Sequence, residues 1–318
     1  MQPRRGLVLG SGGILGAAWM TGALAALQQR LPVPVGELDF IVGTSAGSVL
    51  VAALRRGFTV DQMAAHQRDG PRGALAALGS PDLGCGSRPP RPRFRLGSPR
   101  LLLTGMRAPR QVHPWVLASA CLPEGRAEHH ELRAMLLGLD AQAEGWPACG
   151  ETWIMAVDFG TGQRVAFGRR GAPPASLPEA VVASCSVPGW FRPAVIGGHR
   201  YVDGGARSIA SADQLAGVGL DEVYVLAADA SLVMDRPRRP LEWAERRLRA
   251  LLTSALLREL GTLRSSGTRV IVLTPGPEDL AAMGSNLMDP SRRRDVFEVS
   301  LSTSARSLAD VPATLAGR

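Results

Sequence analysis

The sequence predicts an α/β fold in which a mixed, mainly parallel central sheet is flanked by helices. Two stretches near the N-terminus, residues 6–30 and 38–56, each run from a short apolar segment through a glycine-containing turn into a helix-like segment. Successive strand–helix units with short connections favour such a sheet. The 318 residues, 45% of them hydrophobic, suffice for one large core. Since we find no repeat and no linker, we predict a single domain over residues 1–318.

The first unit is predicted to contain a strand at Leu7–Leu9, a glycine loop at Gly10–Gly13 and a helix over residues 14–29. Proline cannot continue a helix, so Pro32 and Pro34 mark its end. The uncharged run over these residues is also long enough for a signal peptide or a membrane span. Because glycines divide the run, a strand–turn–helix unit explains it better, and we expect no N-terminal targeting segment.

The second unit carries the pattern Gly-x-Ser-x-Gly at Gly43–Gly47, between an apolar strand and an apolar helix. In that position the pattern is typical of a nucleophile elbow, although alone it also occurs in ordinary glycine-rich turns. A serine on so sharp a turn has strained backbone angles, and the small neighbours Gly43, Ala46 and Gly47 let other segments approach. The helix N-terminus directs N–H groups at an anion formed nearby. We therefore predict that Ser45 is a nucleophile.

An arginine- and proline-rich segment follows a predicted helix over residues 57–78. Residues 83–123 contain no acidic residue, and their arginines are concentrated in the part from 86 to 110. We predict a loop or loosely structured insertion there. It is either a solvated variable loop or a basic lid facing a membrane over an active site. Nucleic-acid binding has no support from interleaved aromatic residues or a known motif.

The later elements complete the predicted sheet. Strands at 153–157 and 164–167 are expected to form a hairpin, and a helix begins near Pro178. Two short strands joined at Gly197-Gly198 end at Asp203. A C-terminal extension over about 207–318 is predicted to contain a strand at 223–227, an amphipathic helix at 241–263, a strand at 269–273 and a final helix from Pro290.

Charge and cysteine content limit the classes of function. The formal net charge is +8, and all 36 basic residues are arginine, which favours attraction to anionic surfaces such as a membrane. The cysteines lack the C-x-x-C spacing of zinc sites, and we expect reduced thiols in a cytoplasmic protein that can be peripheral at a membrane. They are Cys85, Cys121, Cys149 and Cys185. We expect no metal and no organic cofactor.

A nucleophilic serine needs a general base, and histidine is the usual one. An ordinary α/β-hydrolase places its histidine late in the chain, whereas here no histidine follows His199. His199 lies in a predicted hairpin turn, where an exposed histidine is common. Asp203 is the better candidate, because the following Gly204 and Gly205 allow a tight turn that brings the carboxylate close to another segment. An aspartate bonded to its own turn backbone is an equally good interpretation of that spacing.

The glycine loop at the start of the chain also has two interpretations. Its N–H groups lead into a helix N-terminus and would form a nest for an oxyanion. Alternatively, Gly10, Gly12 and Gly16 with Glu37 or Asp39 downstream could form a dinucleotide fingerprint. The second interpretation leaves the elbow at Ser45 unexplained.

Taken together, four motifs in this order resemble the patatin-like phospholipases. They are the loop Gly10–Gly16, the elbow Gly43–Gly47, the segment Ala183-Ser184-Cys185-Ser186-Val187-Pro188-Gly189, and Asp203-Gly204-Gly205. The resemblance covers about residues 5–206, and Gly284–Asp289 is similar to the tail of one bacterial branch. It implies a three-layer α/β fold and a Ser45–Asp203 dyad without histidine. It also implies an oxyanion hole made by the N–H groups of Gly12, Gly13 and Ser11.

The resemblance implies a lipid acyl hydrolase that acts on carboxylic esters of phospholipids or related lipids through an acyl-enzyme. The pKa of Asp203 should then lie above that of a free aspartate, as burial would produce. Leu15 stands where the family usually has arginine or lysine. A catalytically weak or inactive membrane-associated protein with this fold therefore stays an alternative, as does a dinucleotide-binding protein. The oligomeric state is not predicted.

Overall fold

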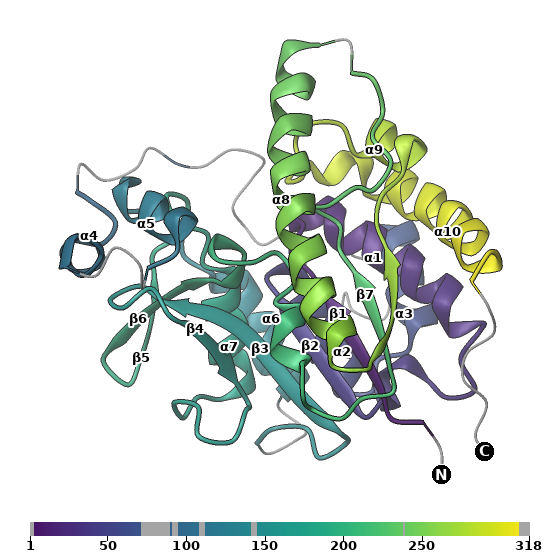
Figure 1. Cartoon of the computed structure of the whole chain (residues 1–318), viewed down its shortest axis with the longest axis horizontal. Helices are drawn as coiled ribbons and strands as arrows, with labels where there is room; N and C mark the ends of the chain where they lie inside the picture. Colours follow the sequence, from purple (N-terminus) through teal and green to yellow (C-terminus); the bar gives the residue numbers. More distant parts are fainter. Residues whose placement is uncertain are drawn as a thin grey trace.

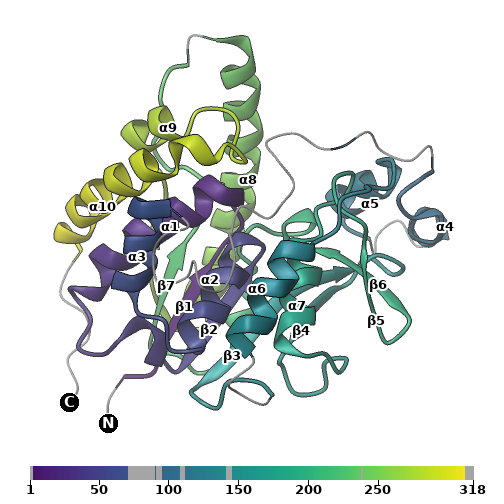
Figure 2. The ribbon, with the colours of Figure 1, turned by 180° about the vertical axis from the view of Figure 1, so that it is seen from behind.

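The computed structural model describes residues 3–70, 90, 95–107, 112–140, 145–237 and 239–311. Much of the predicted arginine-rich insertion, including Arg88, Arg91, Arg93 and Arg110, lies outside the described residues, as does Cys85. Figures 1 and 2 show a central sheet between two layers of helices, with a smaller group of helices beside the sheet's antiparallel end.

The described residues form one eight-stranded sheet in the order β5-β6-β3-β2-β1-β7-β8, with β4 also paired to β3. The pairs among β1, β2, β3, β7 and β8 are parallel, whereas β4, β5 and β6 join by antiparallel pairing. The predicted fold class is confirmed. The strands are β1 (Arg5–Leu9), β2 (Phe40–Thr44), β3 (Glu151–Asp158), β4 (Arg164–Phe167), β5 (Ala194–Ile196), β6 (His199–Asp203), β7 (Glu222–Leu226) and β8 (Arg269–Leu273).

Helices cover both faces of this sheet (Figures 1 and 2). Within the described part of the chain they are α1 (Gly13–Gln28), α2 (Ala46–Arg55), α3 (Val60–Asp69), α4 (Pro99–Arg107), α5 (Pro114–Cys121), α6 (His130–Asp140), α7 (Leu177–Cys185), α8 (Pro240–Ser265), α9 (Pro277–Met283) and α10 (Arg293–Ala309). None of these helices is long and apolar enough to cross a membrane.

Alternation along the strands divides the core into two layers. In β1, Leu7 and Leu9 pack with α1, α2 and α10, whereas Val8 packs on the other face with Leu256 and Leu260 of α8. Residues after 206 supply both α8 and the strands β7 and β8, and β7 pairs directly with β1. The C-terminal part of the chain therefore completes the sheet and both of its helical layers.

The segment predicted to be a loose insertion contains two helices, α4 and α5, so that part of the prediction is wrong. The prolines begin these helices: Pro99 and Pro114 occupy the first turn, where a missing N–H costs nothing. Leu101 and Val116 are fully buried against Phe159 and its neighbours at the end of β3. An apolar face thus holds both helices against the sheet.

Candidate active site

Ser45 lies on a sharp turn between β2 and α2, as the elbow pattern predicts. Its φ of 53° and ψ of −122° place a non-glycine residue in a strained region. The glycines on either side are needed for close packing. A Cβ on Gly47 would lie 2.1 Å from the Leu9 carbonyl oxygen, and one on Gly43 would lie 2.6 Å from the Ser48 Cα. The elbow is therefore fixed against the end of β1.

The elbow backbone is also held by α7. The Ser45 N–H donates to the Ser184 hydroxyl at 2.8 Å, and that hydroxyl donates to the Met155 carbonyl at 2.7 Å. Ser184 is fully buried, so both bonds are shielded from water. The segment around Ser184 therefore fixes the backbone of Ser45.

Strand β3 brings Asp203 to Ser45. The N-terminal part of β3 pairs with β2, and Met155 lies opposite Thr44. The next residue, Ala156, lies opposite Asp203 at the end of β6. Because β4 pairs along the other edge of β3, the C-terminal ends of β2 and β6 meet on the same edge. This junction joins a serine and an aspartate that are far apart in the sequence.

The Asp203 carboxyl is buried, and its surroundings match the role of a base. Its Oδ1 accepts the Gly205 N–H at 2.7 Å, and the Ser45 side chain is near enough to lower its pKa. Burial raises the pKa of Asp203 to about 7, although the Ser45 side chain and the Gly205 N–H lower it and the charge of Asp229 raises it further. The expectation of an elevated pKa is met. A carboxyl that titrates near neutral pH suits proton transfer.

The glycine loop ends in N–H groups directed at the same region. Within the described residues, the N–H groups of Gly12 and Gly13 have no acceptor, and Gly13 begins α1 with a φ of +60°. The Ser11 N–H instead donates to the Ile209 carbonyl at 2.8 Å. The prediction that the Ser11 N–H belongs to the oxyanion hole is therefore not kept, because this N–H is already bonded to Ile209 and holds the loop. The Gly47 N–H donates to the Gly10 carbonyl at 3.1 Å and connects loop and elbow.

Leu15 packs in the hydrophobic core and is fully buried. A basic side chain at this position would therefore be buried among apolar neighbours in this chain. The segment similar to a bacterial-branch tail reaches the loop instead: the Leu287 carbonyl accepts the Leu15 N–H at 2.9 Å, and the Met288 sulfur lies beside Gly13. This segment forms one wall of the site.

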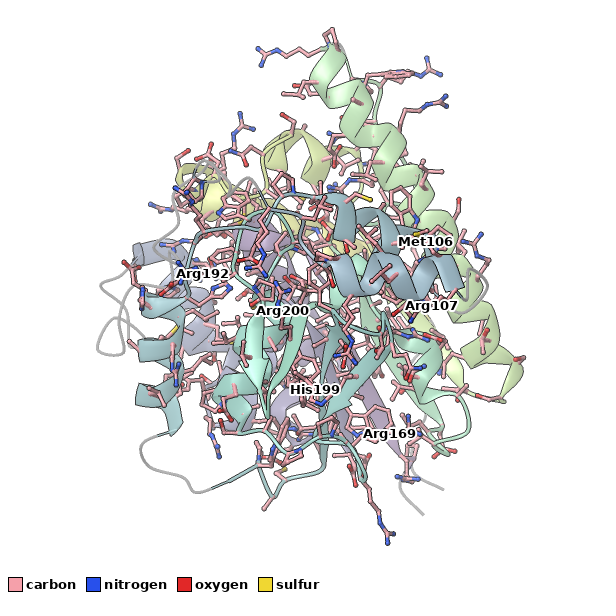
Figure 3. All side chains as sticks on the ribbon, turned by 90° about the vertical axis from the view of Figure 1, so that its left-hand side faces the viewer. Met106, Arg107, Arg169, Arg192, His199 and Arg200 are labelled. Carbon is pink, nitrogen blue, oxygen red and sulfur yellow. The ribbon has the colours of Figure 1, made fainter. Side chains whose placement is uncertain are left out.

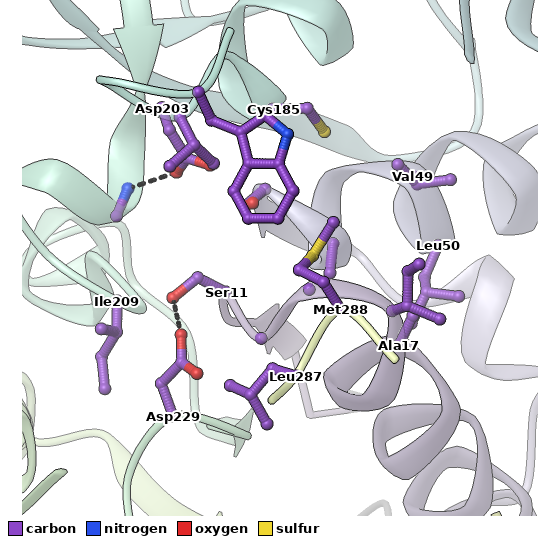
Figure 4. Close-up of a pocket in the computed structure, with 18 of the residues that line it drawn as sticks. Ser11, Ala17, Val49, Leu50, Cys185, Asp203, Ile209, Asp229, Leu287 and Met288 are labelled. Atoms are coloured by element: carbon purple, nitrogen blue, oxygen red, sulfur yellow. Dashed lines mark hydrogen bonds between the residues drawn. The ribbon is translucent and has the colours of Figure 1, made fainter. Parts of the chain in front are cut away.

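A second serine–aspartate pair was missed by the sequence analysis. The Ser11 hydroxyl donates to Asp229 Oδ2 at 2.5 Å, and Ser11 and Asp203 lie on either side of Gly205 (Figure 4). Burial raises the pKa of Asp229, whereas the charge of Arg249 and the Ser11 hydrogen bond lower it. Arg249 donates to the carbonyls on either side, those of Ala228 at 2.5 Å and Ala230 at 3.3 Å. Asp229 could have been suspected because it follows a buried strand that ends at the same sheet edge as β1.

Both pairs line a cavity of about 530 Å³ whose wall is mainly apolar (Figure 4). The cavity lies over the elbow and extends between α1, α2 and the segment after α9. Its apolar lining includes Ile14, Val49, Leu50, Leu139, Leu287 and Met288. The site thus combines a few polar groups with a large surface suited to hydrocarbon.

The histidines occupy other environments. His199 lies on the β5–β6 hairpin, is largely exposed and is 3.4 Å from Asp158 (Figure 3). His129 is buried and stacks on Phe191, and burial lowers its pKa to about 4. His66 of α3 lines the apolar cavity. The carboxyl whose pKa the Ser45 side chain lowers is that of Asp203.

The dinucleotide interpretation is not compatible with the sheet. Asp39 precedes β2, and its Oδ2 accepts the Arg5 N–H at 2.7 Å at the start of β1. The glycine loop follows the other end of β1, so the two are separated by about 16 Å of strand. Glu37 lies in the same connection as Asp39. These acids are too far from the loop to bind a ribose beside it.

Comparison with known proteins includes a family match and several distant structural likenesses, among them VipD and ExoU. The model of the patatin-like phospholipase family matches residues 154–215, which include Asp203. The structure of VipD from Legionella pneumophila is 15% identical, with a TM-score of 0.48 over 97% of this chain and 67% of VipD. The type III effector protein ExoU is 15% identical, with a TM-score of 0.40 over 96% of this chain and 53% of ExoU.

The chain thus spans about two thirds and about half of these two proteins. The family match supports lipid hydrolysis as the general activity. Through residues 154–215, it also confirms the resemblance that the sequence motifs indicate, and the chain is similar to the patatin-like phospholipases.

Proposed function

We propose that the chain is a lipid acyl hydrolase that cleaves carboxylic esters of phospholipids or related lipids through a Ser45–Asp203 dyad. One observation carries this proposal. A serine on a strained strand-to-helix turn lies beside a buried aspartate, whose pKa its side chain lowers, on the wall of a large apolar cavity. Such a cavity accepts an acyl chain, and the dyad supplies a nucleophile with its base.

In the first half of the reaction, Asp203 accepts the proton of the Ser45 hydroxyl while Oγ attacks the ester carbonyl carbon. The carbonyl π bond becomes an oxyanion, which the N–H groups of Gly12 and Gly13 can stabilise. When the carbonyl re-forms, the bond to the alcohol oxygen breaks, and the protonated Asp203 transfers its proton to that oxygen. The products are the free alcohol and an acyl-serine.

In the second half, Asp203 accepts a proton from water, which attacks the acyl-serine carbonyl. Collapse of this second oxyanion releases the fatty acid, and the proton returns from Asp203 to Ser45 Oγ. One water is consumed for each ester, and Asp203 ends in its starting state. A pKa near 7 is suited to a group that both accepts and donates a proton in each cycle.

We also propose that the projecting part of α8 contacts an anionic lipid surface. Figure 1 shows that this part of α8 extends beyond the body of the molecule. Leu241, Trp243 and Leu251 are exposed there, and the Arg247 guanidinium lies 5.1 Å from the Trp243 ring centroid. Leu248 and Leu252 of the same helix line the apolar cavity. Apolar and cationic side chains thus occur together beside a cavity suited to lipid.

Release of fatty acid from phospholipid and diacylglycerol vesicles tests the proposed activity. The wild-type protein should release fatty acid, and Ser45→Ala should release none above the rate without protein. Cosedimentation of both proteins with anionic vesicles should be equal, because the substitution leaves α8 unchanged. If neither lipid is hydrolysed while vesicle binding persists, the protein belongs to the inactive membrane-associated class instead.

A further inference from the structure

A second cavity, of about 520 Å³, lies beside the apolar one. The two share part of their walls, including Gly205 and Ala206, which directly follow the Asp203 turn. Trp115, Ile209 and Leu252 also line both cavities. A molecule whose ester lies at Ser45 can therefore extend past Gly205 and Ala206 into the second cavity.

The second cavity is lined by two arginines and a histidine, whereas Arg293 is the arginine that lines the first within the described residues. Arg207 and Arg258 line the second cavity together with His113. Burial lowers the pKa of His113, and the charges of Arg207, Arg164 and Arg258 lower it further. Its Nδ1 is buried and, within the described residues, has no hydrogen-bond partner. Three guanidinium groups thus produce a positive potential at a site where a polar ring nitrogen is unsatisfied.

Two acids, Asp213 and Glu259, also line this cavity, and both already have partners. Asp213 accepts both Arg164 N–H groups, at 2.7 Å and 2.5 Å. Glu259 accepts the Ala212 N–H at 3.1 Å and is hydrogen-bonded to the Ser208 side chain. Burial raises the pKa of Glu259, while the Ser208 side chain, Arg164 and the Ala212 N–H lower it. Because Asp213 is bonded to Arg164, which does not line the cavity, it is not the ion-pair partner of Arg207 or Arg258.

Arg207 is the central cation of this cavity. In the described part of the chain, its guanidinium forms no ion pair with a carboxylate. Burial and the charge of Arg164 lower the pKa of Arg207, and the smaller effects of Asp213 and Glu259 oppose this. A partly buried guanidinium is stabilised by an anion, and its planar N–H groups match the oxygens of a phosphate.

We propose that the second cavity, lined by His113, Arg207 and Arg258, is a binding site for a phosphate group, that of the lipid whose ester lies at Ser45. The acyl chain would occupy the apolar cavity, the ester would lie at the dyad, and the phosphate would lie beyond Gly205 and Ala206. The lipid part of this inference rests on the proposed function. The phosphate site itself is a property of the cavity and can be tested separately.

Kinetics on a matched pair of lipids test the inference. Phosphatidic acid and diacylglycerol with the same acyl chains differ only in the phosphate. Each is presented in neutral detergent micelles, so that the lipid phosphate is the only anionic group of the surface. Wild-type protein should have a lower KM for phosphatidic acid. Arg207→Gln should raise that KM about tenfold and leave diacylglycerol hydrolysis unchanged, whereas Arg207→Lys should retain part of the preference. Arg264→Gln, on the exposed last turn of α8, is the control for loss of one charge.

Binding of inorganic phosphate to Ser45→Ala protein distinguishes the sources of the ligand. Phosphate binding that is weakened by Arg207→Gln, without a preference for phosphatidic acid, would assign the site to free phosphate. The inference is overturned if neither phosphate binding nor phosphatidic acid hydrolysis depends on Arg207, or if Arg264→Gln has the same effect. If no lipid is hydrolysed but phosphate binding depends on Arg207, only the proposed function fails.

Discussion

Two serine–aspartate pairs line the apolar cavity, and they differ in the charge that acts on each carboxyl. Ser45 and Asp203 lie at the ends of β2 and β6. Ser11 lies in the glycine loop, and Asp229 lies in the connection after β7. Burial raises the pKa of both aspartates. The charge of Asp229 raises the pKa of Asp203 further, whereas the charge of Arg249 lowers the pKa of Asp229.

The different charges around Asp203 and Asp229 suit the two serine–aspartate pairs to different roles. Asp203 has a pKa of about 7 and can exchange a proton, so it is suited to be a base. Burial raises the pKa of Asp229 too, with the charge of Arg249 and the Ser11 hydrogen bond opposing it, and its Oδ2 accepts the Ser11 hydroxyl. Ser11 in turn precedes the free N–H groups of Gly12 and Gly13. The second pair therefore positions the loop that the first pair needs.

The largest expected effect is on the first pair. Ser45→Ala and Asp203→Asn should each lower kcat/KM for a p-nitrophenyl ester by roughly 10³-fold or more, because nucleophile and base act as one unit. His199→Ala should stay within about twofold of wild type, since this side chain lies outside the cavity. Full activity of Asp203→Asn, or loss of activity in His199→Ala, would contradict the dyad.

The pH dependence of the same carboxyl provides a second comparison. Because the base must be ionised, kcat/KM should rise about tenfold per pH unit below 7 and level off above it. The folded chain keeps the Asp203 proton up to about pH 7, whereas the unfolded chain releases it near 3.8. The unfolded state therefore binds fewer protons in this window, and the contribution of Asp203 to stability falls as pH rises through it.

Asp203→Asn cannot titrate and should escape this loss. Its free energy of unfolding should exceed that of wild type at pH 8 by up to about 4 kcal/mol, and the difference should disappear near pH 4. Urea unfolding of both proteins at several pH values measures it. A difference that does not change with pH would show that Asp203 is not a neutral acid in the folded protein below pH 7.

A smaller effect is expected from the second pair. Ser11→Ala and Asp229→Asn should lower kcat about 3- to 30-fold with KM nearly unchanged, because a misplaced loop weakens oxyanion binding only in the transition state. The two substitutions together should cost no more than one, since they break the same bond. Ser254→Ala, on the exposed face of α8, is the control. Additive effects, or effects on KM alone, would contradict a positioning role.

The first pair was predictable from sequence, whereas the second was not. Neighbouring glycines mark the elbow at Ser45, whereas Asp203 was selected by the order of motifs that resembles the patatin-like phospholipases. Asp229 stands in an alanine-rich stretch without a motif, and its partner Ser11 is 218 positions away. Only the pairing of β7 with β1 brings them together. A bond of this kind depends on sheet topology, which the sequence pattern alone leaves open.

The same distinction explains the other differences. Helices α4 and α5 were missed because their prolines suggested loop, although proline in a first turn is compatible with a helix. The Ser11 N–H was assigned to the oxyanion hole because a glycine loop does not reveal which of its donors are used elsewhere. Its acceptor, the Ile209 carbonyl, comes from a distant connection. Local patterns therefore predicted the elements better than their contacts.

The most direct test of the account is to identify which serine is nucleophilic. Wild-type protein is treated with a fluorophosphonate ester, digested and mapped by mass spectrometry, so that labelling of Ser45 and Ser11 is measured in one sample. The account predicts phosphonylation of Ser45, its loss in Asp203→Asn, and slower labelling of the same residue in Asp229→Asn. Labelling at Ser11, or labelling of Ser45 that is unaffected by Asp203→Asn, would contradict the assignment of Ser45 and Asp203 as the catalytic pair.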